Sequence, residues 1–318
     1  MKILIGYDGS ECSDAAIVDL RRAGLPPIAE VSVVSVAEEA SPHFLEVPFA
    51  AMVGGIEPPD SIGDIEQSSN RQLEDAEAFA ALAADRLRAD FPRWQINREC
   101  WVDEAGSALA RKAHAWTPDL IVVGSHGRSA VARLVLGSVS QYVVRNTACS
   151  VRIGRHHLHS QNRPIRLLIG MNTSNEAWNA IHAVGARFWP TGTEVRVLGV
   201  MDCRLLRAMP MSATAEAVPA AVEEKWRGEI SETLHKAVHE LEKSGLQAKL
   251  QIYSGDPGQM LVAEADMWSA DCIFVGAGKS HGPERFLTGS VSRAVASHAH
   301  CSVEVVRSAV QAPCPLAN

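Results

Sequence analysis

The chain has 318 residues, of which 47% are hydrophobic and 21% charged, and its formal net charge is −7. This composition is typical of a globular protein with room for two domains, and it excludes a mainly disordered chain. The acidic balance argues against nucleic acid or an anionic membrane as the main partner, because both bind basic surfaces.

The start of the chain runs directly into an apolar, strand-like segment, Met1–Gly6, without a charged and then apolar leader. No apolar run approaches the length of a membrane span. The seven cysteines are odd in number and include no C-x-x-C pair, so neither a disulfide framework nor a zinc site is expected. We therefore expect a soluble, cytoplasmic protein with reduced thiols.

Short apolar runs and amphipathic stretches alternate through the first half of the chain. The runs have the length and β-branched content of strands covered on both faces, and they are Ile3–Ile5, Val31–Val36, Ile96–Val102, Leu120–Val123 and Val151–Ile153. The stretches predicted to be helical between them are Asp14–Ala23, Ser69–Asp90 and Ser107–Trp116. Ser10 and Ser107 are the expected N-caps of the first and third. The alternation predicts a Rossmann-like or flavodoxin-like α/β module, a five-stranded parallel sheet with helices on both faces.

The segment Glu38–Asn70 fits no element of this pattern. It contains four prolines, the pair Gly54-Gly55 and several acidic residues, and it is too long for an ordinary connection. We expect a partly ordered flap over a functional site. The alternative is a mobile segment without that role.

The same module occurs twice. Lys2–Ser10 matches Arg166–Ser174 at an offset of 164 (172 − 8, Asn172 against Asp8), and later segments match at 152 (271 − 119, Asp271 against Asp119). Such ordered self-similarity predicts a duplication. The predicted organisation is a first module at 1–155, a linker at 156–164, a second module at 165–308 and a C-terminal tail at 309–318. The polar linker contains His156, His157 and His159, which we expect to form a solvated connector, with metal binding as the alternative.

Three glycines after the fourth predicted strand carry the strongest functional signal. Gly124, Gly127 and Gly137 are spaced as G-x2-G-x9-G, and Ser138 follows. A backbone without Cβ at a strand end can turn sharply and approach a bulky anion, and successive N–H groups there can form a concave anion site. Arg128 is a plausible charge partner for that anion.

A helix is expected to begin at Gly137-Ser138 and to run from Val139 to Thr147. Its free N–H groups and positive end would face the same phosphates as the glycine loop. The hydroxyls of Ser138 and Ser140 would add hydrogen-bond donors. The pattern predicts a phosphate-binding cup.

Asp119–Ser140, together with Ile3–Ser10 and the tandem duplication, resembles the universal stress protein family. The resemblance covers nearly the whole chain and is weakest at Glu38–Asn70. It implies a sheet of five parallel strands in each module and, as in many members, ATP binding through a G-x2-G-x9-G-[ST] signature. The bound nucleotide would be ATP, ADP or AMP, with Mg as an accompanying ion.

The resemblance also implies a role for each matching residue. Asp8 would lie near the ribose and adenine, and the backbone of Val36 would meet the adenine. The sugar and phosphate path would be lined by Val123, Gly124, His126, Gly127 and Arg128. The phosphates would be held by Gly137, Ser138, Val139 and Ser140.

The second copy departs from the pattern at two positions. Asn172 stands where the first copy has Asp8, which removes an anionic acceptor, and Lys279 stands where it has Gly127. Lys279 either fills the pocket, leaving a structural module with a degenerate site, or serves as a phosphate cation in a modified site.

No nucleophile with its base is recognisable, so the sequence predicts no catalytic residue. The first hypothesis is an adenine-nucleotide-binding regulator of a stress response, whose protein partner is unknown. A weak ATPase and a ligand-free interaction scaffold are the alternatives. The β-rich runs Val151–Ile153 and Val303–Val306 would each leave a sheet edge, and we expect them to pair. The chain would then be an intramolecular pseudo-dimer, and whether whole chains also form a homodimer stays open.

Overall fold

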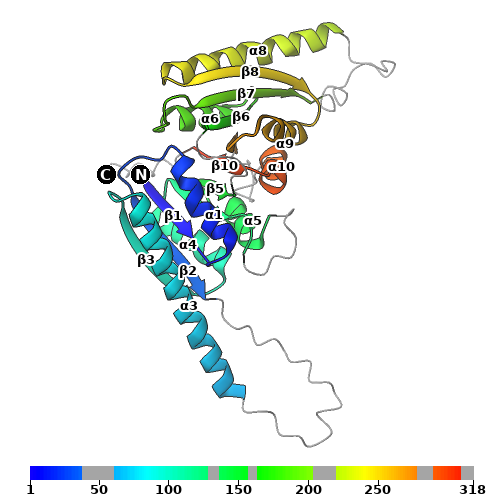
Figure 1. Cartoon of the computed structure of the whole chain (residues 1–318). Helices are drawn as coiled ribbons and strands as arrows, with labels where there is room; N and C mark the ends of the chain where they lie inside the picture. Colours follow the sequence, from blue (N-terminus) through cyan, green and yellow to red (C-terminus); the bar gives the residue numbers. More distant parts are fainter. Residues whose placement is uncertain (38–60, 128–135, 157–162, 203–219, 278–288, 309–318) are drawn as a thin grey trace, which may run out of the picture.

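The chain folds into one ten-stranded sheet, in the order β3-β2-β1-β4-β5-β10-β9-β6-β7-β8, which runs through both halves of the molecule (Figure 1). The structure is a computed structural model and describes residues 1–37, 61–127, 136–156, 163–202, 220–277 and 289–308. Each half contributes five parallel strands, and the halves meet where β5 pairs antiparallel with β10. The predicted parallel α/β sheet and the predicted pairing of the terminal strands are confirmed.

The strands form where the sequence contains its buried β-branched runs. Those of the first half are β1 (Lys2–Gly6), β2 (Glu30–Ala37), β3 (Gln95–Val102), β4 (Leu120–Gly124) and β5 (Ser150–Gly154). Those of the second half are β6 (Arg166–Met171), β7 (Glu194–Met201), β8 (Gln247–Ser254), β9 (Cys272–Gly276) and β10 (Ser302–Val306). Each strand of the first half contains the run predicted for it.

The described helices follow the strands in the same order in both halves. The first half has α1 (Glu11–Asp19), the 3-10 turn η1 (Leu20–Arg22), α3 (Ser61–Asp90), α4 (Ala105–Trp116) and α5 (Ser138–Asn146). The second half has α6 (Asn175–Gly185), α8 (Ala220–Lys243), α9 (Pro257–Trp268) and α10 (Ser290–His298). Ser10 caps α1 as predicted, since its hydroxyl accepts from the N–H of Ser13 at 3.1 Å.

Two expectations about helix starts are wrong. The N-cap of α4 is Glu104 and not Ser107, because β3 ends at Val102 and the chain turns into the helix at once. Helix α3 begins at Ser61, so the last part of the segment expected to be irregular is helical. The final proline of that segment is Pro59, and the sequence from Ser61 to Asp90 contains no proline that would interrupt the helix. The rest of the expected flap, residues 38–60, lies outside the described residues.

The two faces of the sheet are packed differently. On one face, α4, α5, α9 and α10 share a continuous core, which contains Leu109 and Val143 of the first half and Leu261 and Val295 of the second. On the other face, α1 and α3 cover a core made only by the first half. Helices α6 and α8 cover a separate core made mainly by the second half. The buried apolar cluster is therefore continuous between the halves on one face and separate in each half on the other.

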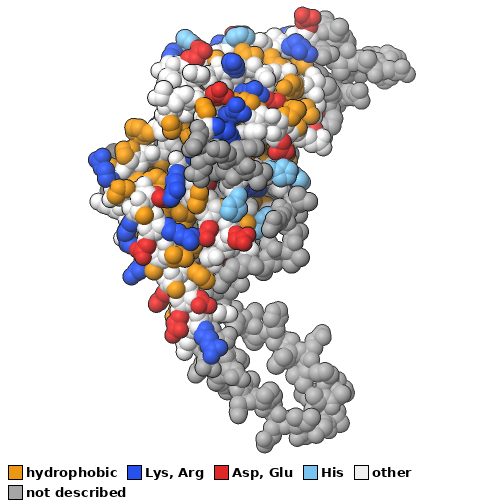
Figure 2. Space-filling view, viewed as in Figure 1, with side chains coloured by type: hydrophobic (Ala, Val, Ile, Leu, Met, Phe, Trp, Pro, Cys, Tyr) orange, Lys and Arg blue, Asp and Glu red, His pale blue; other side chains and the backbone are white. Residues whose placement is uncertain are grey.

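The surface carries charges of both signs. On the face seen in Figure 2, Lys and Arg side chains alternate with Asp and Glu side chains over both halves of the molecule. Among the described helices, none is both long enough and apolar enough to cross a membrane.

Candidate functional site

A cavity of about 670 Å³ opens at the carboxyl ends of β1, β2 and β4. In this half the strand order is β3-β2-β1-β4-β5. The sheet grows from β1 through β2 to β3 in one direction and from β4 to β5 in the other, so the strand order switches between β1 and β4. Ligands of doubly wound sheets bind in the crevice beyond such a switch point. The volume lies in the range of small-molecule sites.

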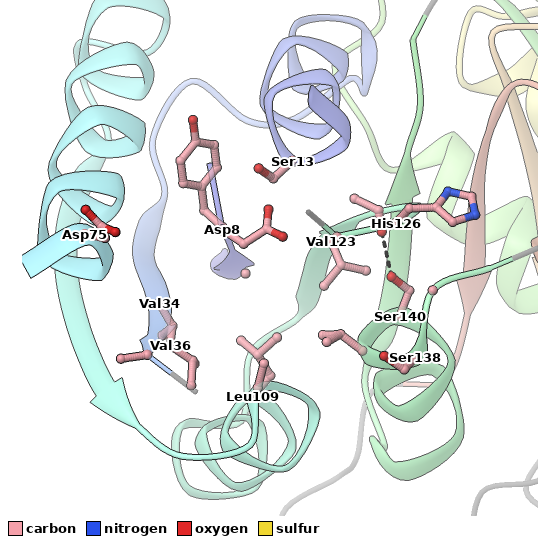
Figure 3. Close-up of a pocket in the computed structure, with 18 of the residues that line it drawn as sticks. Asp8, Ser13, Val34, Val36, Asp75, Leu109, Val123, His126, Ser138 and Ser140 are labelled. Atoms are coloured by element: carbon pink, nitrogen blue, oxygen red, sulfur yellow. Dashed lines mark hydrogen bonds between the residues drawn. The ribbon is translucent and has the colours of Figure 1, made fainter. Parts of the chain in front are cut away.

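Every predicted site residue that the structure describes lines this cavity (Figure 3). These residues are Asp8, Val36, Val123, Gly124, His126, Gly127, Gly137, Ser138, Val139 and Ser140. Arg128 lies outside the described residues. The fold thus brings the predicted residues together from the end of β1, from β2, from β4 and its following loop, and from the start of α5.

Asp8 is held in position by the turn that leads into α1. Its Oδ1 atom accepts from the N–H of Ser10 at 3.0 Å and from the Ser10 hydroxyl at 2.6 Å. The other oxygen, Oδ2, lies 3.0 Å from the point that a Cβ on Gly127 would occupy. Gly127 therefore leaves room for this carboxylate, and a side chain there would press against it.

The amino end of α5 supplies hydrogen-bond donors that have no acceptor among the described residues. Its N-cap is Gly137, which offers no side chain to the first turn, and the Gly137 N–H itself donates to the carbonyl of Ser125 at 2.8 Å. The N–H groups of the three residues that follow, Ser138 to Ser140, have no acceptor within the helix. They and the positive end of the helix face the cavity, where an anion would be favoured.

Two of the predicted contacts have a different physical basis from the one expected. The Ser140 hydroxyl is not a free donor, because it donates to the carbonyl of Gly124 at 2.6 Å and so braces the loop (Figure 3). A Cβ on Gly124 would lie 2.7 Å from the carbonyl carbon of Cys12. The close approach of α1 to β4 thus by itself requires a glycine at position 124.

His126 lines the cavity through its backbone. Its imidazole ring points away from Asp8 and Val36 in Figure 3, and its Nδ1 atom lies 3.2 Å from the Ser125 hydroxyl. Its Nε2 atom is buried without a hydrogen-bond partner among the described residues. The ring is therefore not placed to contact a ligand in the cavity.

The opposite end of the cavity is apolar and is formed by β2 and α4. Val34, Val36 and Leu109 lie there. The pairing of β1 with β2 ends at Gly6 and Val34, and the N–H of Tyr7 donates to the Val34 carbonyl at 3.0 Å. Two residues further on, the backbone groups of Val36 point to the same edge, which β1 has already left. They can meet a planar base.

The sequence analysis missed the contribution of α3. Gln72 and Asp75 lie three residues apart on one helix face, and both line the cavity. Figure 3 shows Asp75 on the side opposite Ser138 and Ser140. Their spacing was visible in the sequence, but nothing local indicated that this face of α3 would turn toward β2.

Tyr7 and Ser13 were missed as well. Burial raises the pKa of Tyr7, and the hydrogen bond from its hydroxyl to Asp14, at 2.5 Å, raises it further. Arg86 of α3 forms an ion pair with the same Asp14. The tyrosine is therefore a neutral donor that ties β1 to α1, and α3 is fastened to the same point.

The second half retains the scaffold of this site with altered groups. Asn172 accepts from the N–H of Ser174 at 3.0 Å, as Asp8 does from Ser10. Gly276, like Gly124, is required by packing, since its Cβ would lie 2.0 Å from the carbonyl oxygen of Glu176. Lys279 lies outside the described residues.

A metal site belonging to the protein itself would need several acidic, histidine or cysteine side chains close together. Among the described residues, no group of three or more His, Cys, Asp or Glu side chains is arranged to hold a metal ion. Of the linker histidines, His156 is described, and the other two lie outside the described residues.

Two curated relatives match parts of the chain. A universal stress protein of Synechocystis, Sll1388, is 42% identical over 55 residues, which cover 17% of this chain and 36% of that protein. A universal stress protein of Mycolicibacterium smegmatis is 28% identical over 158 residues, which cover 49% of this chain and 46% of that protein. The matches therefore span less than half the length of these relatives.

Solved structures match almost the whole chain. The crystal structure of a universal stress protein from Archaeoglobus fulgidus aligns with a TM-score of 0.64 at 18% identity, covering 96% of this chain and 98% of that chain. A functionally unknown protein from Pseudomonas aeruginosa, PA1789, aligns with a TM-score of 0.57 at 14% identity, covering 96% and 92%. At these identities the likeness shows the fold.

The family comparison covers both modules. The model of the universal stress protein family matches residues 1–155 and again residues 165–307. The resemblance seen in the glycine loop and in the duplication is thereby confirmed. The chain belongs to the universal stress protein family, of which it contains two modules in tandem.

Proposed function

We propose that the first module binds an adenine nucleotide and that its occupancy regulates a stress response. The observation that carries the proposal is the cavity at the switch point. One end of it has amide donors without an acceptor among the described residues, and the other end has an apolar slot beside a strand edge that β1 leaves open. Membership in the universal stress protein family supports the stress-response role.

The two ends of the cavity orient the ligand in this proposal. The phosphates lie at the start of α5 and at Gly127, where backbone N–H groups and the helix end favour an anion. The adenine lies between Leu109 and the edge of β2 at Val36, and the ribose hydroxyls donate to Asp8. The reverse orientation would bring the phosphates to Asp75, on the side opposite Ser138 and Ser140, and its carboxylate would repel them.

A divalent ion would enter with the phosphates. Because the described residues provide no metal site of their own, a Mg ion would be held mainly by phosphate oxygens, with Asp8 as the nearest carboxylate. The described residues include no nucleophile placed with a base, so we propose binding rather than turnover. A cytoplasmic protein partner would read the bound state.

The experiment is native mass spectrometry of gently purified chain, followed by calorimetric titration with ATP, ADP and AMP, each with and without Mg. We expect one adenine nucleotide for each chain. An absence of both co-purified nucleotide and binding would overturn the proposal and favour a ligand-free scaffold. Steady-state release of phosphate that stops on substitution of Gly127 would instead make the protein an ATPase.

A further inference from the structure

The junction between the two modules lies on a local two-fold axis. In the antiparallel pair of β5 and β10, Arg152 lies opposite Glu304. These two positions are equivalent in the duplication (304 − 152 = 152). The two flanking pairs, Val151 with Val305 and Ile153 with Val303, are also equivalent to each other. If two copies of the first module paired through β5 in the same register, Arg152 would therefore face a second Arg152.

Part of the junction obeys this two-fold symmetry. Arg155 donates to the carbonyl oxygen of Ala296, at 2.6 Å, within the last turns of α10, and to that of Cys301, at 3.2 Å, just beyond the helix. The equivalent Arg307 donates to the carbonyls of Val144, at 2.5 Å, and Cys149, at 3.1 Å, at the end of α5. Cations at helix carboxyl ends are favourable. We call Arg155 and Arg307 the symmetric clamps, and they would fit any pairing of the modules.

A buried ionic quartet, Asp19, Arg152, Arg187 and Glu304, breaks the symmetry. Arg152 pairs with Asp19 at 2.5 Å and with Glu304 at 3.1 Å, and Arg187 pairs with Glu304 through two hydrogen bonds. None of these side chains is more than 9% exposed. The four formal charges cancel. The quartet lies on the face where the two modules have separate cores, between α1 and α6.

The equivalent positions carry none of the complementary charges. In the second module, Ala183 stands where the first has Asp19 (19 + 164), and in the first module Ala23 stands where the second has Arg187 (187 − 164). The first module thus supplies an acid on α1 and a base on its last strand, Asp19 and Arg152. The second supplies a base after α6 and an acid on its last strand, Arg187 and Glu304. Asp19 pairs with Arg152, and Arg187 with Glu304, inside one module, whereas the contact between Arg152 and Glu304 forms only when unlike modules meet.

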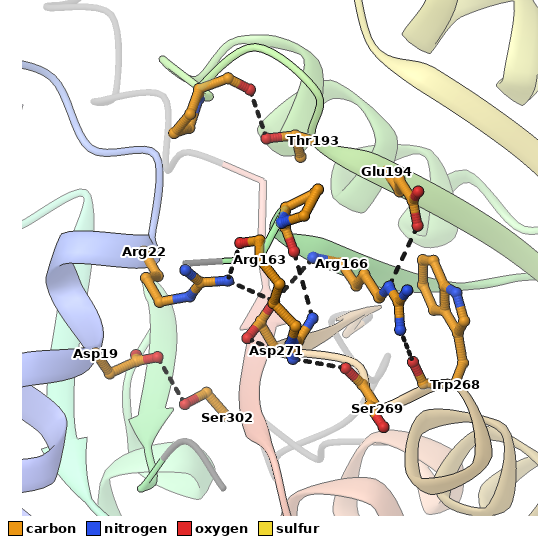
Figure 4. A network of polar contacts seen from close by, with 12 residues as sticks. Asp19, Arg22, Arg163, Arg166, Thr193, Glu194, Trp268, Ser269, Asp271 and Ser302 are labelled. Carbon is orange, nitrogen blue, oxygen red and sulfur yellow. Dashed lines mark hydrogen bonds and ion pairs between the residues drawn. The ribbon is translucent and has the colours of Figure 1, made fainter. Parts of the chain in front are cut away.

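Other contacts across the junction follow the same rule. The Ser302 hydroxyl donates to Asp19 at 2.8 Å, and Arg22 pairs with Asp271 at 3.0 Å (Figure 4). The position equivalent to Arg22 in the second module is Ala186 (22 + 164). The ion pairs across the junction are therefore asymmetric, whereas the contacts of Arg155 and Arg307 with backbone carbonyls are symmetric.

We propose that the ionic quartet determines which strand pairs with the edge of β5. Only a strand with an acidic residue opposite Arg152 is accepted, and we call this requirement the code. The partner of β5 is the second module, and a second copy of the first module is rejected. A pair of like modules would bury Arg152 against Arg152, or Glu304 against Glu304, and would replace the attraction between Arg152 and Glu304 by repulsion, although Asp19 or Arg187 of the same module would stay beside each charge. Like charges buried face to face repel each other strongly in a low-dielectric interior, whereas a complete ionic network contributes little net stability. The code thus acts on the choice of partner.

The first test removes the tether between the modules. A protease site is introduced between residues 157 and 162, and the folded full chain is cleaved and taken through a urea unfolding and refolding cycle. Native mass spectrometry then counts the pairs. We expect unlike pairs alone. Like pairs in the proportions of random association would overturn the proposal.

A matched variant erases the code without leaving an unpaired charge. Asp19→Ala and Arg187→Ala copy the residue of the other module, and Arg152→Leu with Glu304→Leu makes the two-fold positions identical. In the cleaved chain, this quadruple variant should form like and unlike pairs together. If it still forms only unlike pairs, shape and not charge selects the partner. Arg307→Ala, which removes one symmetric clamp, should weaken the pairing without changing its composition.

The intact chain gives a second measurement that needs no refolding of separate halves. Glu304→Arg places two cations face to face and should lower the melting temperature by roughly 10 °C. The neutral quadruple variant should melt within a few degrees of the unaltered chain. An equal loss in both variants would mean that the quartet only stabilises the junction, and the proposal would fail.

Discussion

The carboxyl edges of the two modules share one scaffold but differ in the groups that they present. Asp8 and Asn172 each close the same turn, accepting from a serine N–H at 3.0 Å. Helices α5 and α10 both begin at a glycine without a side-chain cap. Yet one turn carries a carboxylate and the other an amide. The comparison teaches that the turn is needed for folding in both modules, whereas the charge is kept only where we propose a ligand.

The largest expected effect tests the shared scaffold. Gly124→Ala would place a Cβ 2.7 Å from the Cys12 carbonyl carbon, and Gly276→Ala would place one 2.0 Å from the Glu176 carbonyl oxygen. Since backbone must move in both cases, we expect losses of about 3 kcal/mol in the free energy of unfolding, larger for Gly276. Urea unfolding measures them.

The matched control is Gly228→Ala on the exposed face of α8, where a Cβ meets nothing within 4 Å. It should stabilise the chain by about 0.5–1 kcal/mol, because alanine favours the helix. If Gly124→Ala were equally harmless, the close approach of α1 to β4 would not be what requires this glycine.

The next largest effect tests the side chain that differs between the two turns, the carboxylate of Asp8 against the amide of Asn172. Asp8→Asn copies the residue of the second module and keeps the oxygen that accepts from Ser10. We expect nucleotide affinity to fall about tenfold, because a charged acceptor is lost, while the free energy of unfolding changes little. Asn172→Asp, the reverse change in the second module, should leave affinity unchanged. Equal affinity of Asp8→Asn and the unaltered chain would remove Asp8 from the site.

The smallest expected effect concerns Ser140 of α5 and its counterpart Ser292 of α10, the last helices of the two modules. The Ser140 hydroxyl reaches across to the Gly124 carbonyl at 2.6 Å, whereas that of Ser292 bonds to Gly289 in its own first turn at 3.3 Å. Ser140→Ala should therefore cost about 1 kcal/mol of stability and weaken nucleotide binding a few-fold. Ser292→Ala should cost a few tenths and leave binding alone. Identical behaviour of the two variants would contradict the bracing role.

The sequence predicts the fold and the position of the site because both depend on local signals. Buried β-branched runs mark the strands, and the spacing of Gly124, Gly127 and Gly137 marks the loop at the switch point. Asp8 and Val36 are found because the family resemblance assigns them roles and β1 and β2 end beside that loop.

The remaining features depend on how separate elements pack. Gln72 and Asp75 enter the cavity only because α3 docks on β2 in one rotation. The reason for Gly124 is the nearness of α1, which no local pattern contains. Arg152 stands between two apolar residues of a strand, and only the packing of α1 and of the partner strand shows that Asp19 and Glu304 neutralise it.

The central claim is that the backbone around Gly127 forms an anion cup in the first module alone. Calorimetric titration with ATP of the unaltered chain and of Gly127→Lys, which copies Lys279 into the first module, tests it most directly. Gly228→Lys, at an exposed glycine with open space around it, controls for the added charge. We predict one bound nucleotide in the unaltered chain and in Gly228→Lys, and a loss of about 2 kcal/mol or more of binding free energy in Gly127→Lys. Equal affinity of all three proteins would contradict the account.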